Sequence, residues 1–283
     1  MLRKLNEAES RVVYSLYTRG LSMSKIARVL AKKYPGITAT NVRTAINGYL
    51  ERKRLSSSTP RRRSSSGTPI RDANRMNRIR FCEQMLSNNE QFSNIVFVDE
   101  TTIYIDPMSS ELIREGEALR PDQAKEPSMS VHVWGGISCE GAVPVQILDG
   151  NVPMAAPMYC QIIRQYYLPF VEIIFDSRCR LAHKRTPIHS SRVAKEMFKN
   201  WNIENFEWPP ESADLDPMEY VWRDLMEFLR NECKPRNVVE LSKSIRKFWN
   251  DKVTHIQCRV YVSHIRTAMR KVISANGDSI MDL

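Results

Sequence analysis

Two acidic residues in this chain stand where an enzyme could use them to bind a metal ion. Asp99 follows the apolar run 94–98, which is typical of a short buried strand, and Glu219 lies at the start of a predicted helix. Enzymes built from strands and helices place metal-binding carboxylates at the ends of such strands. Asp99 and Glu219 are therefore our candidate catalytic and metal-binding residues.

A second group of residues has the chemistry to bind nucleic acid. Residues 1–54 show the apolar periodicity of three short helices, and the third of these carries polar side chains opposite its apolar stripe. Such side chains can reach base edges in the major groove, as the recognition helix of a helix-turn-helix does. The candidates are Asn41, Arg43, Thr44 and Asn47. Any small three-helix bundle shows the same periodicity, so this pattern alone leaves a purely structural bundle open.

The positive charge of the chain is concentrated in its N-terminal quarter. Residues 1–80 contain 19 Lys and Arg against 4 Asp and Glu, whereas residues 81–283 contain 23 against 28. This imbalance favours a polyanionic partner, because neutralising phosphates releases counterions. No amphipathic helix with a strong apolar face accompanies the charge, as binding to a membrane surface would require. We expect double-stranded DNA as the partner and no membrane association.

Residues 55–70 read as a linker rich in Ser, Arg and Pro, with no means of building a core. Basic clusters lie just before it and within it, and they add to the candidate DNA-binding residues: Arg52, Lys53, Arg54, Arg61, Arg62 and Arg63. Such clusters suit an arm that enters the minor groove, a nuclear import signal, or both, and we expect a nuclear location. An inert solvated tether would have the same composition.

The composition excludes several classes of protein. Hydrophobic residues make up 42% and charged residues 26%, which is typical of soluble globular proteins. No apolar run approaches the roughly 18 residues of a membrane helix, and no signal-peptide core follows Met1, so we expect a soluble intracellular protein. The six cysteines contain no C-x-x-C pair and the five histidines do not cluster with them, which indicates neither a disulfide framework nor a zinc site.

Residues 71–283 alternate between strand and helix patterns and predict one α/β domain with a mixed sheet and flanking helices. An amphipathic helix is expected at 71–90, followed by the strand at 94–99 and a hairpin partner at 104–105. Further strands are expected at 131–138, 143–148, 178–183 and 203–207, and helices at 157–175, at 189–201 and from 217 onward.

The segment around Glu219 carries the most specific signal. Residues 208–222 read W-P-P-E-S-A-D-L-D-P-M-E-Y-V-W, which resembles the W-P-x-x-S-P-D-L-N-P-I-E-x-x-W signature of the mariner superfamily of cut-and-paste DNA transposases. In chain order, residues 98–100 are similar to the family's S-D-E, 132–136 to its V-W-G-G, 148–150 to its I-D-G, and 187–190 to the end of its Q-D-N-A-P-x-H-S. The resemblance continues to residues 263–277 and covers essentially the whole chain.

The resemblance implies an RNase H-like catalytic domain over 71–283, preceded by a small all-α helix-turn-helix domain over 1–54. In that family three carboxylates hold two Mg²⁺ ions, which activate the attacking oxygen and stabilise the leaving one. Asp99 matches the first carboxylate and Glu219 the third. The second position aligns with Lys184, since 34 residues separate Lys184 from Glu219 as the family's interval demands, and the neighbouring Asn aligns with Arg185.

A lysine at the second position conflicts with metal binding. An ammonium group cannot coordinate Mg²⁺; it would repel both ions and pair with Asp99 or Glu219 instead. We therefore expect these two carboxylates to be vestigial ligands, with no cofactor, and Mg²⁺ only if the chain is catalytically active. Asp176 is the alternative ligand, although it precedes the strand that should carry one. The family generally has two helix-turn-helix subdomains, whereas here the linker leads straight into residues 71–90.

These observations favour a transposase-derived DNA-binding protein that has lost cut-and-paste catalysis. Its α/β domain would serve as a platform for a homodimer or for protein partners. The first alternative is an active transposase or nuclease with altered metal ligation, which predicts Mg²⁺-dependent strand cleavage. The second is a protein-interaction scaffold whose charge is incidental, which predicts no affinity for DNA. Asp99 and Glu219 would then be structural residues held by an ion pair with Lys184.

Overall fold

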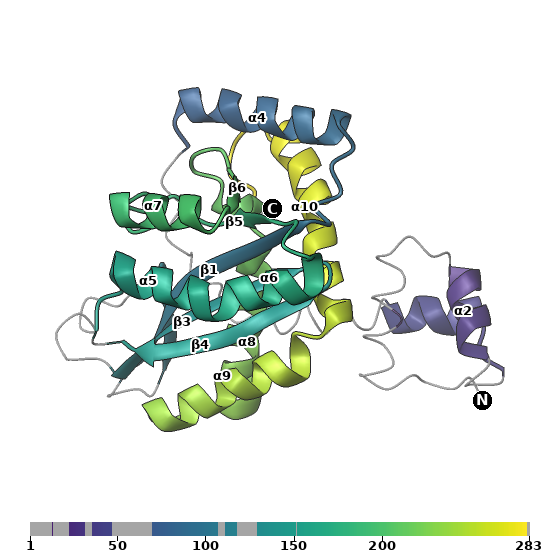
Figure 1. Cartoon of the computed structure of the whole chain (residues 1–283). Coiled ribbons are helices and arrows are strands. Elements are labelled where there is room, and N and C mark those ends of the chain that lie inside the picture. Colours follow the sequence, from purple (N-terminus) through teal and green to yellow (C-terminus); the bar gives the residue numbers. More distant parts are fainter. Residues whose placement is uncertain are drawn as a thin grey trace. The chain divides into compact units, whose positions relative to one another are not determined.

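The computed structural model describes Val13 and residues 23–31, 36–46, 70–106, 111–117, 129–150 and 152–281 (Figure 1). The chain divides into two compact units, Met1–Ser64 and Ser65–Leu283, and the border falls within the predicted linker. Asn47 and the basic clusters at 52–54 and 61–63 lie outside the described residues. Among the described helices none is long and apolar enough to cross a membrane.

The first unit contains two of the helices expected from the sequence. Helix α2 (Met23–Ala31) and the helical residues 39–46 pack their apolar faces together. The buried side chains of this small core are Val13, Ile26, Ala27, Val42, Ala45 and Ile46. The apolar stripes predicted for these two helices are therefore confirmed.

The second unit is built on a mixed sheet of six strands. These are β1 (Ile95–Ile105), β2 (Leu112–Arg114), β3 (Met129–Ser138), β4 (Gly141–Asp149), β5 (Arg180–Ala182) and β6 (Glu204–Phe206). The strand order is β4-β3-β1-β5-β6, with β2 paired to the end of β1. Strands β2, β3 and β4 run antiparallel to their neighbours, whereas β5 and β6 run parallel to β1 and to each other.

Strand β1 corrects one expectation. The sequence predicts a strand that ends at Asp99 and a separate hairpin partner at 104–105, but β1 is continuous and Asp99 lies in its middle. The branched residues Thr101, Thr102 and Ile103 favour continued extension, and β3 pairs with β1 from Phe97 to Ile105. The actual hairpin partner is β2.

Helices cover both faces of the sheet (Figure 1). One face packs against α8 (Met218–Phe228), α9 (Val238–Lys252) and α10 (His255–Ser274), and α4 (Asp72–Ser87) packs on α10. The other face packs against α5 (Ala156–Ile162), α6 (Leu168–Phe175) and α7 (Arg192–Asn200). Short helical segments complete the unit: η2 (Ile163–Tyr167), η3 (Ala213–Leu215) and η4 (Leu229–Cys233). The predicted α/β domain with a mixed sheet and flanking helices is confirmed.

Two glycines of β3 leave room for close neighbours beside Asp99, and the first of them lets a helix approach the sheet. Gly135 of β3 lies directly opposite Asp99, and a Cβ there would lie 2.3 Å from the indole Cη2 of Trp249 in α9. A Cβ on Gly136 would lie 2.8 Å from Cγ1 of Val98. Both positions require the absence of a side chain, which gives the predicted V-W-G-G resemblance a steric reason.

Helix α4 differs from the amphipathic helix predicted for 71–90, because its buried face carries a charged residue. Arg78 is fully buried, and its two terminal nitrogens donate to the two carboxylate oxygens of Asp214 at 2.8 and 2.7 Å. Its Nε donates to the backbone oxygen of Gly277 at 2.9 Å. A paired and fully hydrogen-bonded guanidinium can replace an apolar side chain in a core. Arg78 thereby ties α4 both to the segment that leads into α8 and to the C-terminal end.

Replacing Arg78 with Met should strongly destabilise the second unit. The change leaves the buried carboxylate of Asp214 without its counter-charge, a loss typically worth about 3–5 kcal/mol. Urea unfolding of the full chain measures it. The matched control is Arg80→Met on the exposed side of the same helix, which should change the free energy of unfolding by less than about 0.5 kcal/mol. Equal effects of the two substitutions would contradict this account.

Candidate functional site

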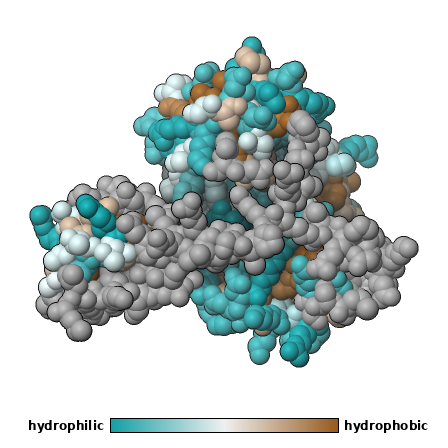
Figure 2. All heavy atoms as spheres, turned by 180° about the vertical axis from the view of Figure 1, so that it is seen from behind, coloured by the Kyte–Doolittle hydropathy of each residue, from teal (hydrophilic) through white to brown (hydrophobic). Residues whose placement is uncertain are grey.

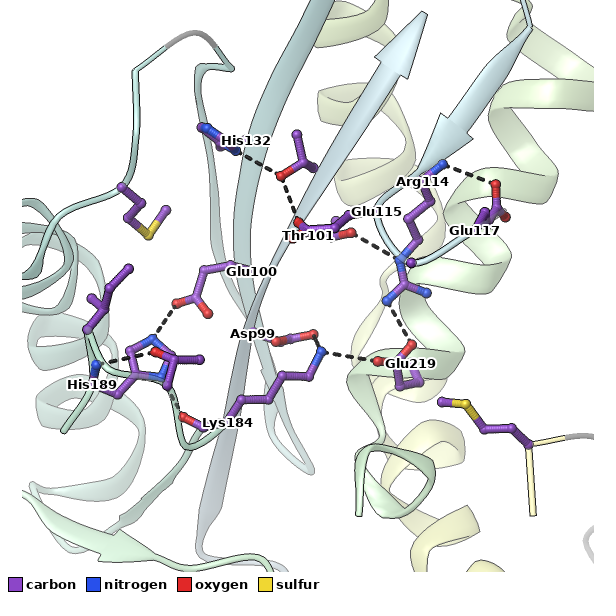
Figure 3. A pocket seen from close by; sticks show the side chains of 16 residues that line it. Asp99, Glu100, Thr101, Arg114, Glu115, Glu117, His132, Lys184, His189 and Glu219 are labelled. Carbon is purple, nitrogen blue, oxygen red and sulfur yellow. Dashed lines mark hydrogen bonds and ion pairs between the residues drawn. The ribbon is translucent and has the colours of Figure 1, made fainter. Parts of the chain in front are cut away.

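A cleft of about 610 Å³ opens beside the middle of β1 (Figure 3). Strand β5 pairs with residues 95–97 and β2 with residues 103–105, so neither strand covers the stretch of β1 between them. The cleft lies along this stretch. Its described lining comes from β1, from β2 and the turn after it, from β3, from the loop 184–189 and from the first turn of α8.

Three sequence-predicted residues meet in this cleft. The Nζ of Lys184 donates to Oδ2 of Asp99 at 2.9 Å and to Oε1 of Glu219 at 3.1 Å. Lys184 follows β5, the parallel neighbour of β1, and this adjacency brings its side chain to Asp99. The ion pair expected from the sequence is therefore present (Figure 3).

Two further groups hold these carboxylates, and the sequence reasoning missed both. The indole Nε1 of Trp222 donates to Oδ2 of Asp99 at 2.8 Å. Arg114 in β2 donates from Nη2 to Oε2 of Glu219 at 2.7 Å and from Nε to Oγ1 of Thr101 at 3.0 Å. Trp222 lies three residues after Glu219, on the same face of α8, which is a signal the sequence offered. Arg114 reaches the cleft only through the pairing of β2 with β1, and no spacing predicts that.

The charges of this cluster shift one another's pKa values. Burial raises the pKa of Glu219, but the positive charges of Lys184 and Arg114 lower it by a larger amount, so the net shift is downward. Burial lowers the pKa of Lys184, but Asp99 and Glu219 outweigh it and the net shift is upward. Burial raises the pKa of Asp99 despite Lys184. Burial and the nearby Asp99 also raise the pKa of Asp216 well above its ordinary value. The ammonium and Glu219 are thus charged at neutral pH.

The loop that carries Lys184 is fixed by a buried cluster of rings. His189 bonds through Nδ1 to the backbone oxygen of Lys184 and through Nε2 to Oε1 of Glu100 at 3.2 Å. His183 stacks on His189 with ring centroids 4.7 Å apart, and its Nδ1 lies 2.8 Å from the hydroxyl oxygen of Tyr159. Each ring nitrogen of His189 faces an acceptor, which favours the doubly protonated form of the ring. Burial lowers the pKa of His189, but the hydrogen bond and the charge of Glu100 outweigh burial, so the net shift is upward.

Comparison with known proteins identifies the family. Residues 94–242, more than half of the chain, match the DDE superfamily endonuclease family. The chain belongs to this family. The Tc3 transposase of Caenorhabditis elegans is 22% identical over 217 residues, covering 73% of this chain and 63% of that protein. The Tcb2 transposase of Caenorhabditis briggsae is 25% identical over 165 residues, covering 56% and 60%. The chain thus spans about three fifths of these relatives' lengths.

Solved structures of Mos1 transposase share the fold of this chain. A pre-cleavage Mos1 transpososome matches with a TM-score of 0.61 and 15% identity, over 98% of this chain and 80% of that chain. The catalytic domain of Mos1 mariner transposase matches with a TM-score of 0.57 and 16% identity, over 75% and 97%. The second unit therefore has the RNase H-like fold that the sequence resemblance implies.

The cleft of this DDE family member does not suit the two Mg²⁺ ions that the family resemblance implies. The oxygens of Asp99 and Glu219 that face each other already hold the Lys184 ammonium, and Arg114 takes the other oxygen of Glu219. No group of three His, Cys, Asp or Glu in the described parts of the chain could hold a metal ion. Asp176, the alternative ligand, lies at the end of α6, is 87% exposed and pairs with Arg178, so it is outside the cleft lining.

In the first unit, the candidate DNA-reading residues divide into two groups. Arg43 and Thr44 are exposed, as base readers must be. Asn41 is buried, and its Oδ1 accepts a hydrogen bond from the backbone N of Thr38 at 2.9 Å. Its side chain holds the start of the helix and does not face solvent, which corrects its assignment to the reading face. Asn47 lies outside the described residues.

Replacing Lys184 with Met should destabilise the protein, because Asp99 would keep only the Trp222 donor for a fully buried carboxylate. The expected loss is about 1–3 kcal/mol in the free energy of unfolding. The control, Lys199→Met, removes an exposed lysine from α7 and should be nearly neutral. If Lys184→Met is as stable as the wild type in urea, the ion pair is incidental.

His183 should contribute a loss of stability as the pH drops, because the fold holds it in its neutral form. Burial and the neighbouring His189 lower the pKa of His183 from 6.5 to about 3. Below pH 6.5 the unfolded state binds a proton that the folded state excludes, so this group removes about 1.4 kcal/mol per pH unit until about pH 3. His183→Asn should remove this contribution and so change the slope of stability against pH between pH 6.5 and 4.5, whereas His255→Asn, at an exposed site, should leave the slope as in the wild type. Parallel curves for wild type and His183→Asn would refute the assignment.

Proposed function

We propose that this chain is a transposase-derived protein that binds duplex DNA and has lost cut-and-paste catalysis. The observation that carries the second half of this proposal is the Lys184 ammonium, 2.9 Å from Asp99 and 3.1 Å from Glu219. Metal-assisted phosphoryl transfer requires a cluster of free anionic oxygens that can neutralise two dications. Here one ligand has been exchanged for a cation that uses the oxygens of the other two.

Arg114 strengthens the argument against catalysis. Its guanidinium donates to the oxygen of Glu219 that Lys184 does not contact. Both carboxylate oxygens of Glu219 therefore accept a hydrogen bond from a positively charged side chain. Asp99, Glu219, Lys184 and Arg114 together have no net formal charge. A cluster without net negative charge offers a dication little electrostatic attraction, and the dication would have to displace two charge-assisted hydrogen bonds on Glu219.

DNA binding is supported by the distribution of charge and by the family. The basic residues concentrate in residues 1–80, and Arg43 and Thr44 are exposed on the helix at 39–46. One Mos1 structure of similar fold is a paired-end complex with a transposon end. We assign the same class of partner to this chain, with the first unit and the basic clusters at 52–54 and 61–63 as the binding region, and a nuclear location to match.

Purified protein should neither nick plasmid DNA with Mg²⁺ or Mn²⁺ nor bind either metal tightly in calorimetric titrations. Lys184→Asp should raise the affinity for Mn²⁺ only modestly, because Arg114 still holds Glu219, and Lys184→Asp with Arg114→Gln should raise it further, by about tenfold or more. Arg185→Asp adds the same acid at an exposed neighbouring site and serves as the control. Metal-dependent nicking by the wild type would show an active nuclease with altered ligation.

The full chain should bind duplex DNA with an affinity that falls steeply as salt concentration rises. If Arg43 reads a base, Arg43→Ala should reduce the preference for a selected site by about 1–3 kcal/mol. Arg246→Ala, at an exposed position of the second unit, should leave both affinity and preference unchanged. A loss of affinity that is uniform over all sequences would instead make Arg43 a phosphate contact, and the absence of DNA binding would overturn the proposal.

A further inference from the structure

The cleft is acidic even though it contains Lys184 and Arg114. Its described lining includes two basic side chains of Lys or Arg and five carboxylates: Asp99, Glu100, Glu115, Glu117 and Glu219. Both basic groups are already paired. Lys184 forms ion pairs with Asp99 and Glu219, and Arg114 forms one with Glu219. Glu117 pairs with Arg230. Of the two remaining acids Glu100 is paired with His189, and Glu115 has no ion pair within the described part of the chain.

Glu115 carries the uncompensated charge of the described lining, whereas Glu100 is paired with the imidazole of His189. Within the described part of the chain neither forms an ion pair with Lys or Arg. Glu115 accepts a hydrogen bond from the hydroxyl of Thr102 at 2.8 Å, and that same hydroxyl oxygen lies 2.9 Å from Nδ1 of His132. Glu100 is bonded to His189. Each carboxylate has two oxygens, so each keeps acceptor capacity toward the cleft.

A buried oxygen in the same cleft also has no donor. The side chain of Asp99 is fully buried, and its Oδ2 receives both Lys184 and Trp222. Its Oδ1 accepts no hydrogen bond from any described residue. A buried acceptor without a partner costs free energy, which a bound donor would recover. Figure 3 shows Asp99, Glu100 and Glu115 among the side chains that line the opening.

The ligand that suits these groups is a cation carried on a long apolar stem. Phosphate groups would meet the uncompensated carboxylate of Glu115, so this cleft disfavours nucleic acid. An Arg or Lys head can donate several hydrogen bonds to carboxylate oxygens such as those of Glu115 and Glu100. The apolar part of the lining, Met154, Ile188 and Met281, offers contact for the methylene stem. The volume lies in the range of ordinary ligand sites.

We propose that this cleft, formerly the position of a metal centre in the family, binds an Arg- or Lys-rich segment of a partner protein. The argument is charge complementarity together with the unpartnered Oδ1 of Asp99. The inference does not depend on DNA binding by the first unit, and it gives the second unit a function of its own. The basic clusters of this chain share the ligand's chemistry, so the experiment must separate them from a partner.

The test uses the full chain and a short fluorescent peptide of alternating Arg and Gly, with binding measured by anisotropy. The wild type should bind this peptide and not its Glu-for-Arg counterpart. Glu115→Gln should weaken binding by about fivefold or more, whereas Glu115→Asp, which keeps the charge, should stay within about twofold. Glu172→Gln, which removes an exposed acid on α6, should have no effect. Circular dichroism of each variant checks that it is folded.

Three outcomes would overturn the proposal. The first is that the Arg peptide does not bind, and the second is that Glu115→Gln and Glu172→Gln lose peptide affinity equally. The third is that a basic segment of this chain competes with the peptide for the cleft. The last is tested by changing Arg61, Arg62 and Arg63 together to Ser: unchanged peptide affinity supports a partner protein, whereas a gain of about tenfold would show that this chain's own segment fills the cleft. Duplex DNA binding is measured separately, so failure of the proposed function and failure of this inference are distinguishable.

Discussion

The ammonium of Lys184 is the one charge on which the centre of this molecule depends. A carboxylate as deeply buried as Asp99 is expensive to keep ionised, and Coulomb attraction from a paired, hydrogen-bonded cation is the means by which proteins reduce that cost. In metal-dependent relatives of this fold type, dications would meet the same demand. Here the cation is covalently part of the chain. The ammonium of Lys184 lies between Asp99 and Glu219 and forms an ion pair with each of them.

Much of the second unit serves to fix that ion pair. β1 supplies Asp99, its parallel neighbour β5 leads into Lys184, and α8 presents Glu219 and Trp222 one turn apart. Gly135 in β3 allows the ring of Trp249 to pack against the sheet opposite Asp99. The His189 and Glu100 pair holds the Lys184 loop from the other side. Arg78 anchors the segment that precedes α8 through Asp214. Charged side chains thus connect the helical layers to the cleft.

Charge is distributed unevenly along the chain: residues 1–80 contain 19 Lys and Arg against 4 Asp and Glu, whereas residues 81–283 contain 23 against 28. Basic residues in the N-terminal quarter suit a phosphate backbone. The described lining of the cleft in the RNase H-like unit contains more carboxylates than Lys and Arg side chains. Figure 2 shows hydrophobic residues on one face only as scattered spots among hydrophilic ones. Charge therefore offers more for recognition on this face than an apolar patch does.

The sequence by itself determined the alternation of strands and helices, the mixed sheet, and the alignment that places Asp99, Lys184 and Glu219 together, because these follow from local periodicity and from motifs of fixed spacing. Tertiary structure alone decided the rest. Arg114 joins the cluster only because β2 folds back on β1, and Arg78 is buried only because Asp214, 136 residues away, meets it. Asn41 faces inward because Thr38 donates to it. A partner distant in the chain leaves no mark on local spacing, so whether a charged side chain is a surface group, a core anchor or a substitute for a metal ion is settled by the fold.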